Sequence, residues 1–274
     1  FSAMFSKVQE GMVSYVYAGV EMFPNTTPLP NFWRAPVDND YGSVMQQRYA
    51  QWKIASLYVS TKHAGRFEEN RPVLERKEHS VVITYTYHMP TTPESACKLT
   101  YEVYGAGAVA VSLEYEPVAE LGDMTEVGVM MKLDADYDHV KWYGLGPEET
   151  YPDRKCGGKL GVYENLVADN IAKYLRPQEC GNKCDVRYAK VTNRKGRGLM
   201  FWGNGMNFSA LPYTPHELEN AAHEYELPEV HYTVVRLGEQ MGVGGDDSWG
   251  AKVLPQYCLD VSGRKQFSFC FKGI

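Results

Sequence analysis

The residues best suited to ligand chemistry lie near the C-terminus, in the stretch Gly244-Gly245-Asp246-Asp247-Ser248-Trp249. Two glycines permit a tight backbone turn. The two carboxylates can accept hydrogen bonds from sugar hydroxyls, and the Trp offers a wide apolar face for the C–H surface of a sugar ring. These six residues alone leave a second interpretation open, in which the Asp side chains accept backbone N–H groups of the turn and the Trp fills the core.

A second group of carboxylates occurs near the N-terminus, where Asp38, Asn39 and Asp40 are consecutive. Two carboxylates and an amide could hold a cation, but an EF-hand needs a longer loop and a distal Glu. We therefore expect these groups to pair with Arg34 or to cap a turn.

Glu148 and Glu149 resemble a catalytic carboxylate pair, but adjacent residues on a strand point to opposite faces and cannot flank one glycosidic bond. Tyr151-Pro152-Asp153-Arg154 is typical of a structural corner, with Asp153 and Arg154 available for buried ion pairing.

The seven His residues include no pair at metal-ligand spacing on a helix face. A mutarotase needs a His acid and a Glu base in one cleft. His223, His231 and Glu179 are the available candidates, although the sequence does not place them together.

The composition indicates which classes of partner are not expected to bind and in which cellular compartment the protein is expected. The chain has 274 residues and a net charge of −6, without a basic run or a membrane-length apolar stretch, so we expect neither nucleic acid nor membrane as a partner. The six Cys residues follow no disulfide or zinc pattern, which favours free thiols in the cytoplasm. The first residue is Phe1 and a strand pattern begins at once, which predicts a fragment of a longer polypeptide.

Strand patterns dominate the chain. Apolar and polar residues alternate over 80–88, 109–116 and 267–272, as in half-buried strands, and Gly105-Ala106-Gly107 predicts a hairpin turn. Helical signals are confined to a capping box at Thr214-Pro215-His216-Glu217, which starts a short helix to about residue 222, and to a turn or two within 43–53. We therefore predict a single all-β domain over 1–274, a large antiparallel sandwich.

Three longer segments identify a family. They are Asn31 to Gly42 (NFWRAPVDNDYG), Trp142 to Arg154 (WYGLGPEETYPDR) and Met241 to Trp249 (MGVGGDDSW). In order and spacing they resemble the C-terminal domain, or separate small chain, of the glycoside hydrolase family 2 β-galactosidases of bacteria. The resemblance covers nearly the whole chain and implies a super-sandwich similar to galactose mutarotase.

The resemblance also implies that bond cleavage and part of substrate binding are carried out by different domains of the enzyme. Full enzymes of this family cleave β-galactosides such as lactose with retention, using two Glu residues on a TIM barrel that this chain lacks, so no catalytic residue is expected here. Trp249 matches a Trp that stacks on sugar in the active site, with Asp247 beside it as a further substrate-binding candidate. Gly42 matches the hinge of an active-site loop, although the stretch that follows is shorter here and an ordinary left-handed turn is the alternative.

The expected partners are a β-galactoside and the remaining domains or large subunit of an oligomeric enzyme. No metal or cofactor is expected in this domain, and Mg²⁺ and Na⁺ are the candidates for the full enzyme. Two other functions remain open, a free-standing aldose 1-epimerase and a non-catalytic carbohydrate-binding module.

Overall fold

The structure is a computed structural model that describes residues 1–24, 26–62, 71–247 and 249–274. Its strands are β1 Ser2–Ser6, β2 Gly11–Tyr17, β3 Val20–Glu21, β4 Leu29–Asn31, β5 Val73–Arg76, β6 Ser80–Met89, β7 Ser95–Tyr104, β8 Val109–Tyr115, β9 Glu126–Asp134, β10 His139–Gly146, β11 Lys159–Leu166, β12 Lys183–Thr192, β13 Gly198–Leu211, β14 Tyr232–Gln240 and β15 Lys265–Gly273. The α-helices are α1 Asp38–Gly42, α2 Met45–Arg48, α3 Ala50–Tyr58 and α4 Pro215–Asn220. No helix of these ranges is long and apolar enough to cross a membrane.

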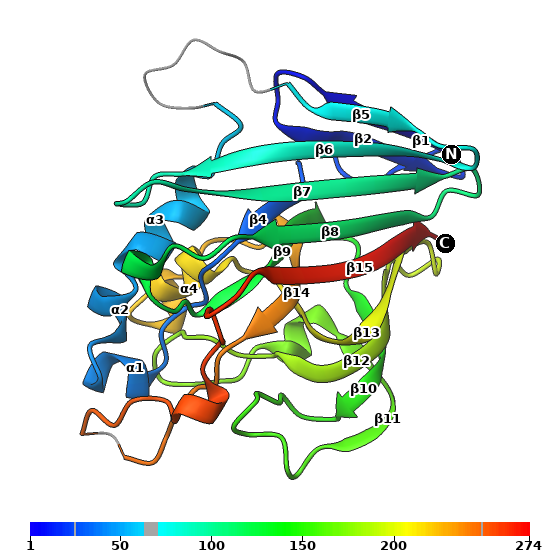
Figure 1. The fold of residues 1–274 in the computed structure, drawn as a ribbon. Helices are drawn as coiled ribbons and strands as arrows, with labels where there is room; N and C mark the ends of the chain where they lie inside the picture. Colours follow the sequence, from blue (N-terminus) through cyan, green and yellow to red (C-terminus); the bar gives the residue numbers. More distant parts are fainter. Residues whose placement is uncertain (25, 63–70, 248) are drawn as a thin grey trace.

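The strands form one large antiparallel sheet that divides at β13, and a small sheet of β1, β2 and β3 (Figure 1). One edge of β13 pairs with β12. Its other edge pairs first with β15, through Leu199 to Trp202, and then with β14, through Asn207 to Leu211. The sheet therefore continues as two layers, β15-β8-β7-β6-β5 and β14-β9-β4. The prediction of a large all-β antiparallel architecture is confirmed.

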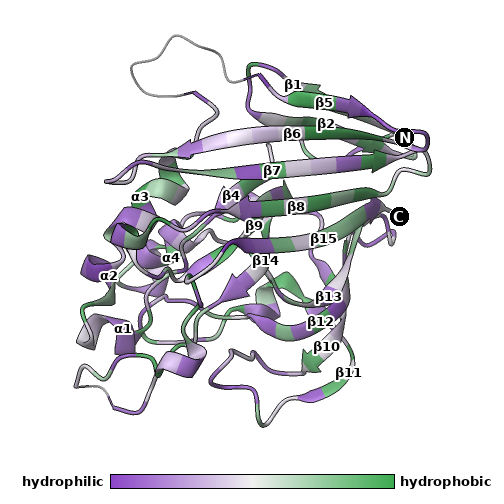
Figure 2. Cartoon of the chain, viewed as in Figure 1, coloured by the Kyte–Doolittle hydropathy of each residue, from purple (hydrophilic) through white to green (hydrophobic). Residues whose placement is uncertain are grey.

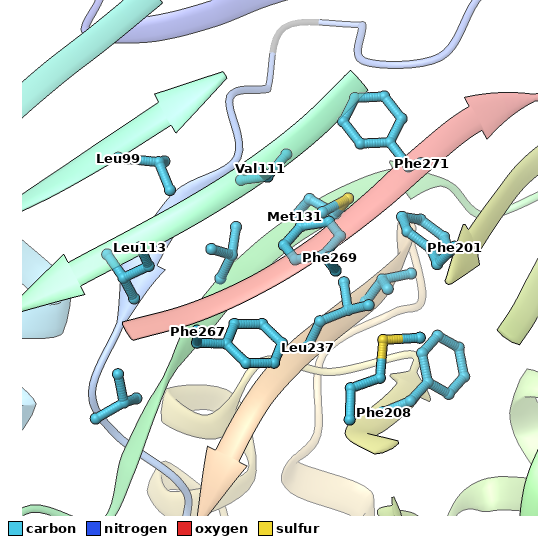
Figure 3. Packing of buried hydrophobic residues seen from close by; sticks show 14 of the residues in the cluster. Leu99, Val111, Leu113, Met131, Phe201, Phe208, Leu237, Phe267, Phe269 and Phe271 are labelled. Atoms are coloured by element: carbon cyan, nitrogen blue, oxygen red, sulfur yellow. The ribbon is translucent and has the colours of Figure 1, made fainter. Parts of the chain in front are cut away.

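The main core fills the space between these layers. Figure 3 shows Phe267, Phe269 and Phe271 of β15 with Met131 of β9 and Leu237 of β14. The period of two places these rings inside, because alternate residues of a strand point to one face. In β8 every second residue is buried, and Figure 2 shows hydrophobic and hydrophilic residues alternating along β7 and β8.

The predicted hairpin and the capping box are confirmed, whereas the region after residue 37 differs from the prediction. The Tyr104–Ala108 hairpin joins β7 to β8, and Gly107 has a φ of 86°. Thr214 caps α4 by accepting the backbone N–H of Glu217 at 3.3 Å. The region after residue 37 is more helical than expected, because α1, α2 and α3 follow one another there. All six Cys residues are free.

Candidate functional site

The β14-β9-β4 layer brings the first and third sequence motifs together. β4 and β14 are both antiparallel to β9 and flank it on either side. Asn31, at the end of β4, pairs with Gly128, and Gln240, at the end of β14, pairs with Glu126. The segments that follow these two strands therefore leave the sheet at the same end of the strands, beside the start of β9.

Arg34 ties these two segments together. Its side chain is fully buried and forms a salt bridge with Asp40 at 2.6 Å, while its Nη2 donates to the Gly242 carbonyl at 3.0 Å. Burial alone would lower the pKa of this guanidinium, but the nearby Asp40 and Glu179 carboxylates raise it, so it remains charged. The expected pairing of Asp40 with Arg34 is confirmed, and Asp38 accepts a hydrogen bond from Gln178 at 3.1 Å.

Asp153, in the segment Trp142 to Arg154, binds the backbone of the C-terminal segment Met241 to Trp249. Its two carboxylate oxygens accept the backbone N–H groups of Val243 and Gly244 at 3.0 and 2.7 Å. A side chain at residue 242 would place its Cβ 2.3 Å from the Asp153 carboxylate, so only Gly fits there. Asp153 thus caps backbone groups, and among the described residues it forms no ion pair of the kind for which the sequence made it available.

The turn that carries the Trp packs against α1. Gly244, Gly245 and Gly250 have φ values of 70°, 116° and 112°, which residues with a side chain rarely adopt. A Cβ on Gly250 would lie 2.9 Å from the carbonyl oxygen of Gly42. The candidate hinge and the candidate sugar-binding turn are therefore in direct contact, beside α1 in Figure 1.

Trp249 lies at the outer end of this turn and is 93% exposed. The alternative that it fills the core is therefore wrong. Asp247 accepts the backbone N–H groups of Trp249 at 2.9 Å and of Ala251 at 3.1 Å through one oxygen. It therefore stabilises the turn, as in the interpretation that the Asp side chains accept backbone N–H groups. Ser248 lies outside the described residues.

Gly42 is the last residue of α1 and is not among the residues of positive φ, so the alternative of a left-handed turn at Gly42 is wrong. The left-handed residue is Val44, with φ 57° and ψ 32°, between α1 and α2. A β-branched residue is strained in this region. Sequence reasoning missed Val44, because no local pattern marks a β-branched residue for this conformation.

Three buried charged side chains meet at the paired strands β9 and β14. The Arg236 guanidinium contacts Glu126 at 2.8 Å and also Glu179, and all three side chains are at most 3% exposed. Gly128 and Gly238 lie between Arg236 and Glu126 on the same face of the paired strands, so no side chain separates the two charges. We call Arg236, Glu126 and Glu179 the Arg236 centre.

The Arg236 centre carries more negative than positive charge. Burial raises the pKa of Glu126 to about 7, while Arg236 opposes the rise and Glu179 adds to it. One guanidinium pairs with two carboxylates, so the ionised form of the buried Glu126 is less favoured than that of a free carboxyl. A charged residue inside the apolar run Val234-Val235-Arg236-Leu237 was the signal available in the sequence.

The other acid–base candidates have structural partners. Glu148 and Glu149 lie in a bend after β10 and not on a strand as expected. Glu149 accepts the Tyr174 hydroxyl at 2.6 Å and the Gly181 N–H at 2.7 Å, and it pairs with the half-exposed Arg154.

The mutarotase candidates are not brought together. Glu179 is buried and bonded to Arg236, whereas His223 and His231 are exposed. Within the described ranges, no group of three or more His, Cys, Asp or Glu side chains is arranged to hold a metal ion.

Comparison with solved structures finds related folds at low sequence identity. A galactose mutarotase related enzyme from Lactobacillus acidophilus aligns over 99% of this chain and 94% of its own, with a TM-score of 0.48 and 9% identity.

Sequence relatives are much closer. A beta-galactosidase from Halalkalibacterium halodurans is 40% identical over 98% of this chain, and a beta-galactosidase small subunit from Latilactobacillus sakei is 32% identical over 98%. The chain spans 26% of the first protein and 92% of the second. The family described as Beta galactosidase small chain matches residues 1–271, and this chain therefore belongs to the beta-galactosidase small-chain family.

Proposed function

We propose that this chain completes the active site of a retaining β-galactosidase and contributes a sugar-stacking surface but no catalytic group. The catalytic Glu pair belongs to the large subunit or to the remaining domains of the same enzyme. Two findings support this assignment, namely the family membership and the small-subunit relative, which has nearly the same extent as this chain.

The observation that carries the proposal is the exposure of Trp249 on a fixed turn. The indole of Trp249 is 93% exposed, so both faces of its large apolar ring are available to a ligand, and covering them would remove apolar surface from water. The turn is held by the Asp153 and Asp247 carboxylates and by its contact with Gly42. Trp249 is thus positioned in advance and can stack on a sugar without a large loss of entropy.

The segment that follows α1 offers an apolar surface for the large subunit. In this segment, from Val44 to the end of α3, the side chains of Val44, Ile54, Leu57 and Tyr58 are each at least 42% exposed. Burial of such residues drives protein association. We propose that the catalytic part of the enzyme covers this face and brings its sugar site to Trp249.

The chemistry of this chain is binding and the exclusion of water. Stacking of the indole on the C–H face of a β-galactoside such as lactose would contribute about 1–3 kcal/mol. The proposal places the assembled, oligomeric enzyme in the cytoplasm. Mg²⁺ and Na⁺ stay candidate ions of the full enzyme.

The test uses the enzyme assembled from this chain and its catalytic part. We expect Trp249→Ala to raise KM for lactose by about one to two decades and to weaken inhibition by glucose, with a smaller change in kcat, because a stacking residue transfers no proton. Trp249→Phe should be milder, since an aromatic face remains. Tyr225→Ala removes another exposed aromatic side chain, 82% exposed, and is the matched control.

Unchanged KM and inhibition in correctly assembled Trp249→Ala enzyme would refute the assignment. The isolated chain should not hydrolyse a chromogenic β-galactoside. Activity that stays with the chain after host enzymes have been removed would contradict the proposal that the catalytic Glu pair lies outside it.

A further inference from the structure

A second candidate ligand site lies in a cleft of about 490 Å³ beside β10 and β11. Its walls are the end of β10, the edge strand β11, the bend at residues 147–149 and part of the segment 169–183. The volume lies within the ~300–1,000 Å³ typical of small-molecule sites. Neither α1 nor the Trp249 turn contributes a lining residue. Figure 1 shows β10 and β11 at the lower right and α1 at the lower left.

A buried ammonium group is the most unusual feature of this cleft. Lys183 is 4% exposed, and its Nζ donates to the Pro147 carbonyl at 3.3 Å and lies 4.9 Å from the centre of the Trp142 ring. Burial lowers the pKa of Lys183, and the carboxylates of Glu149 and Glu148 oppose this without forming an ion pair with it in the described structure. An ammonium carries three N–H donors, so two remain for a ligand.

Aromatic surface and further polar groups line the same cleft. The rings of Trp142 and Tyr163 lie 5.5 Å apart at 35°, and Tyr163 is half-buried. Glu148 is exposed at the rim. The Oδ1 of Asn165 makes no hydrogen bond within the described residues, while its amide nitrogen donates to Asn170 at 2.8 Å.

The charges decide which class of ligand fits. Among the described residues, the cleft is lined by Glu148, Glu149, Glu164 and Asp169 and by Lys183 alone among cations. Arg154 pairs with Glu149 and Lys141 with Glu164 from outside this lining, so the cleft has no surplus of positive charge that would select an anion. A purely apolar ligand would leave two of the three N–H donors of the buried ammonium without acceptors, which is costly. A neutral sugar offers hydroxyls to both the ammonium and the carboxylates, and its C–H face suits an aromatic ring.

We propose that this cleft is a second carbohydrate site, which binds a neutral mono- or disaccharide through Lys183, Tyr163 and Glu148. In this site the Lys183 ammonium donates to ring hydroxyls, Glu148 accepts from them and Tyr163 contacts the C–H face. The site is independent of Trp249 and of the role proposed above for this chain.

The test measures binding of D-galactose, D-glucose and lactose to this chain by saturation-transfer NMR and calorimetry. We expect at least one of the three sugars to bind, and Lys183→Met to weaken that binding at least tenfold. This variant retains a long apolar stem and removes a buried charge, so its Tm should be equal or higher. Glu148→Gln changes an exposed residue and provides a second variant that should fold, with a smaller loss of affinity.

Trp249→Ala separates the two sites. Sugar binding that persists in Trp249→Ala and is lost in Lys183→Met supports the cleft. The proposal is overturned if none of the three sugars binds, if Trp249→Ala abolishes the binding, or if folded Lys183→Met and Glu148→Gln both bind like the unchanged chain.

Discussion

The Trp249 turn and the Arg236 centre lie at the same edge of the β14-β9-β4 layer but use charged residues in opposite ways. In the Arg236 centre, one guanidinium pairs with two carboxylates in the interior, and all three side chains are at most 3% exposed. In the turn, the carboxylates of Asp153 and Asp247 accept backbone N–H groups and hold an exposed Trp in place. Charge in the first region maintains the fold, whereas charge in the second positions an apolar surface for a ligand.

This difference predicts that stability and substrate binding depend on different residues. The α1 segment lies between the two regions. Its Asp40 pairs with Arg34, whose guanidinium also interacts electrostatically with Glu179 of the Arg236 centre, and the carbonyl oxygen of its Gly42 faces Gly250 of the turn. Mutations in either region therefore show how strongly the buried charges and the exposed turn are coupled.

The largest expected effect comes from removing the central cation. Arg236→Met leaves two buried carboxylates without their partner and should lower the free energy of unfolding by about 3–5 kcal/mol. Trp249→Ala should change it by no more than about 0.5 kcal/mol, because the indole is exposed. Urea unfolding of both variants checks the contrast, and similar stability losses in the two would remove the distinction.

The second effect concerns pH. The pKa of Glu126 is raised to about 7 in the folded protein from an ordinary value of 4.5, first by burial and then by Glu179, against Arg236. The folded state thus prefers the protonated carboxyl. The stabilisation is complete below about pH 4.5 and is lost as the pH rises through 7, by an amount on the order of 3 kcal/mol.

The measurement is the free energy of unfolding between pH 5 and 8 for the unchanged chain and for Glu126→Gln. Their difference isolates Glu126, because contributions of other groups cancel. One such group is the half-buried His216, whose pKa is lowered to about 4, first by desolvation. A difference curve without slope in this range would show that Glu126 stays ionised.

A smaller effect is expected at the turn itself. Asp247→Ala removes the acceptor for two backbone N–H groups and should destabilise the turn by about 1 kcal/mol. In the assembled enzyme this should raise KM for lactose a few-fold while Tm stays nearly constant, because the turn opens locally. Asp246→Ala removes the adjacent exposed carboxylate and is the control. Equal effects of the two variants would show that the loss of negative charge changes KM, and not the loss of the hydrogen bonds that Asp247 accepts.

The smallest effects are expected between α1 and α2. Val44→Gly should stabilise the chain by up to about 1 kcal/mol, since Gly adopts the left-handed conformation without strain. Gly42→Ala should alter kcat or KM by less than tenfold if the loop moves during turnover. Thermal unfolding and steady-state kinetics test the two variants, and unchanged kinetics for Gly42→Ala would make Gly42 an ordinary helix end.

The sequence alone determined the strand-rich architecture and the elements that depend on neighbouring residues. The alternation in β6, β8 and β15, the Tyr104–Ala108 hairpin and the α4 capping box were all predictable. Their causes act over a few residues, through the period of two and through local hydrogen bonds. The three family motifs could also be identified in this way, because they are contiguous.

Only the tertiary structure decided what these motifs do to one another. Arg34 and Gly242 are 208 positions apart and meet because β4 and β14 both pair with β9. The same strand register places Arg236 near Glu126, and the Lys183 cleft depends on the packing of a distant segment against β10 and β11. The exposure of Trp249 likewise follows from long-range packing, since a Gly-Gly-Asp-Asp turn by itself is compatible with an indole inside or outside the core.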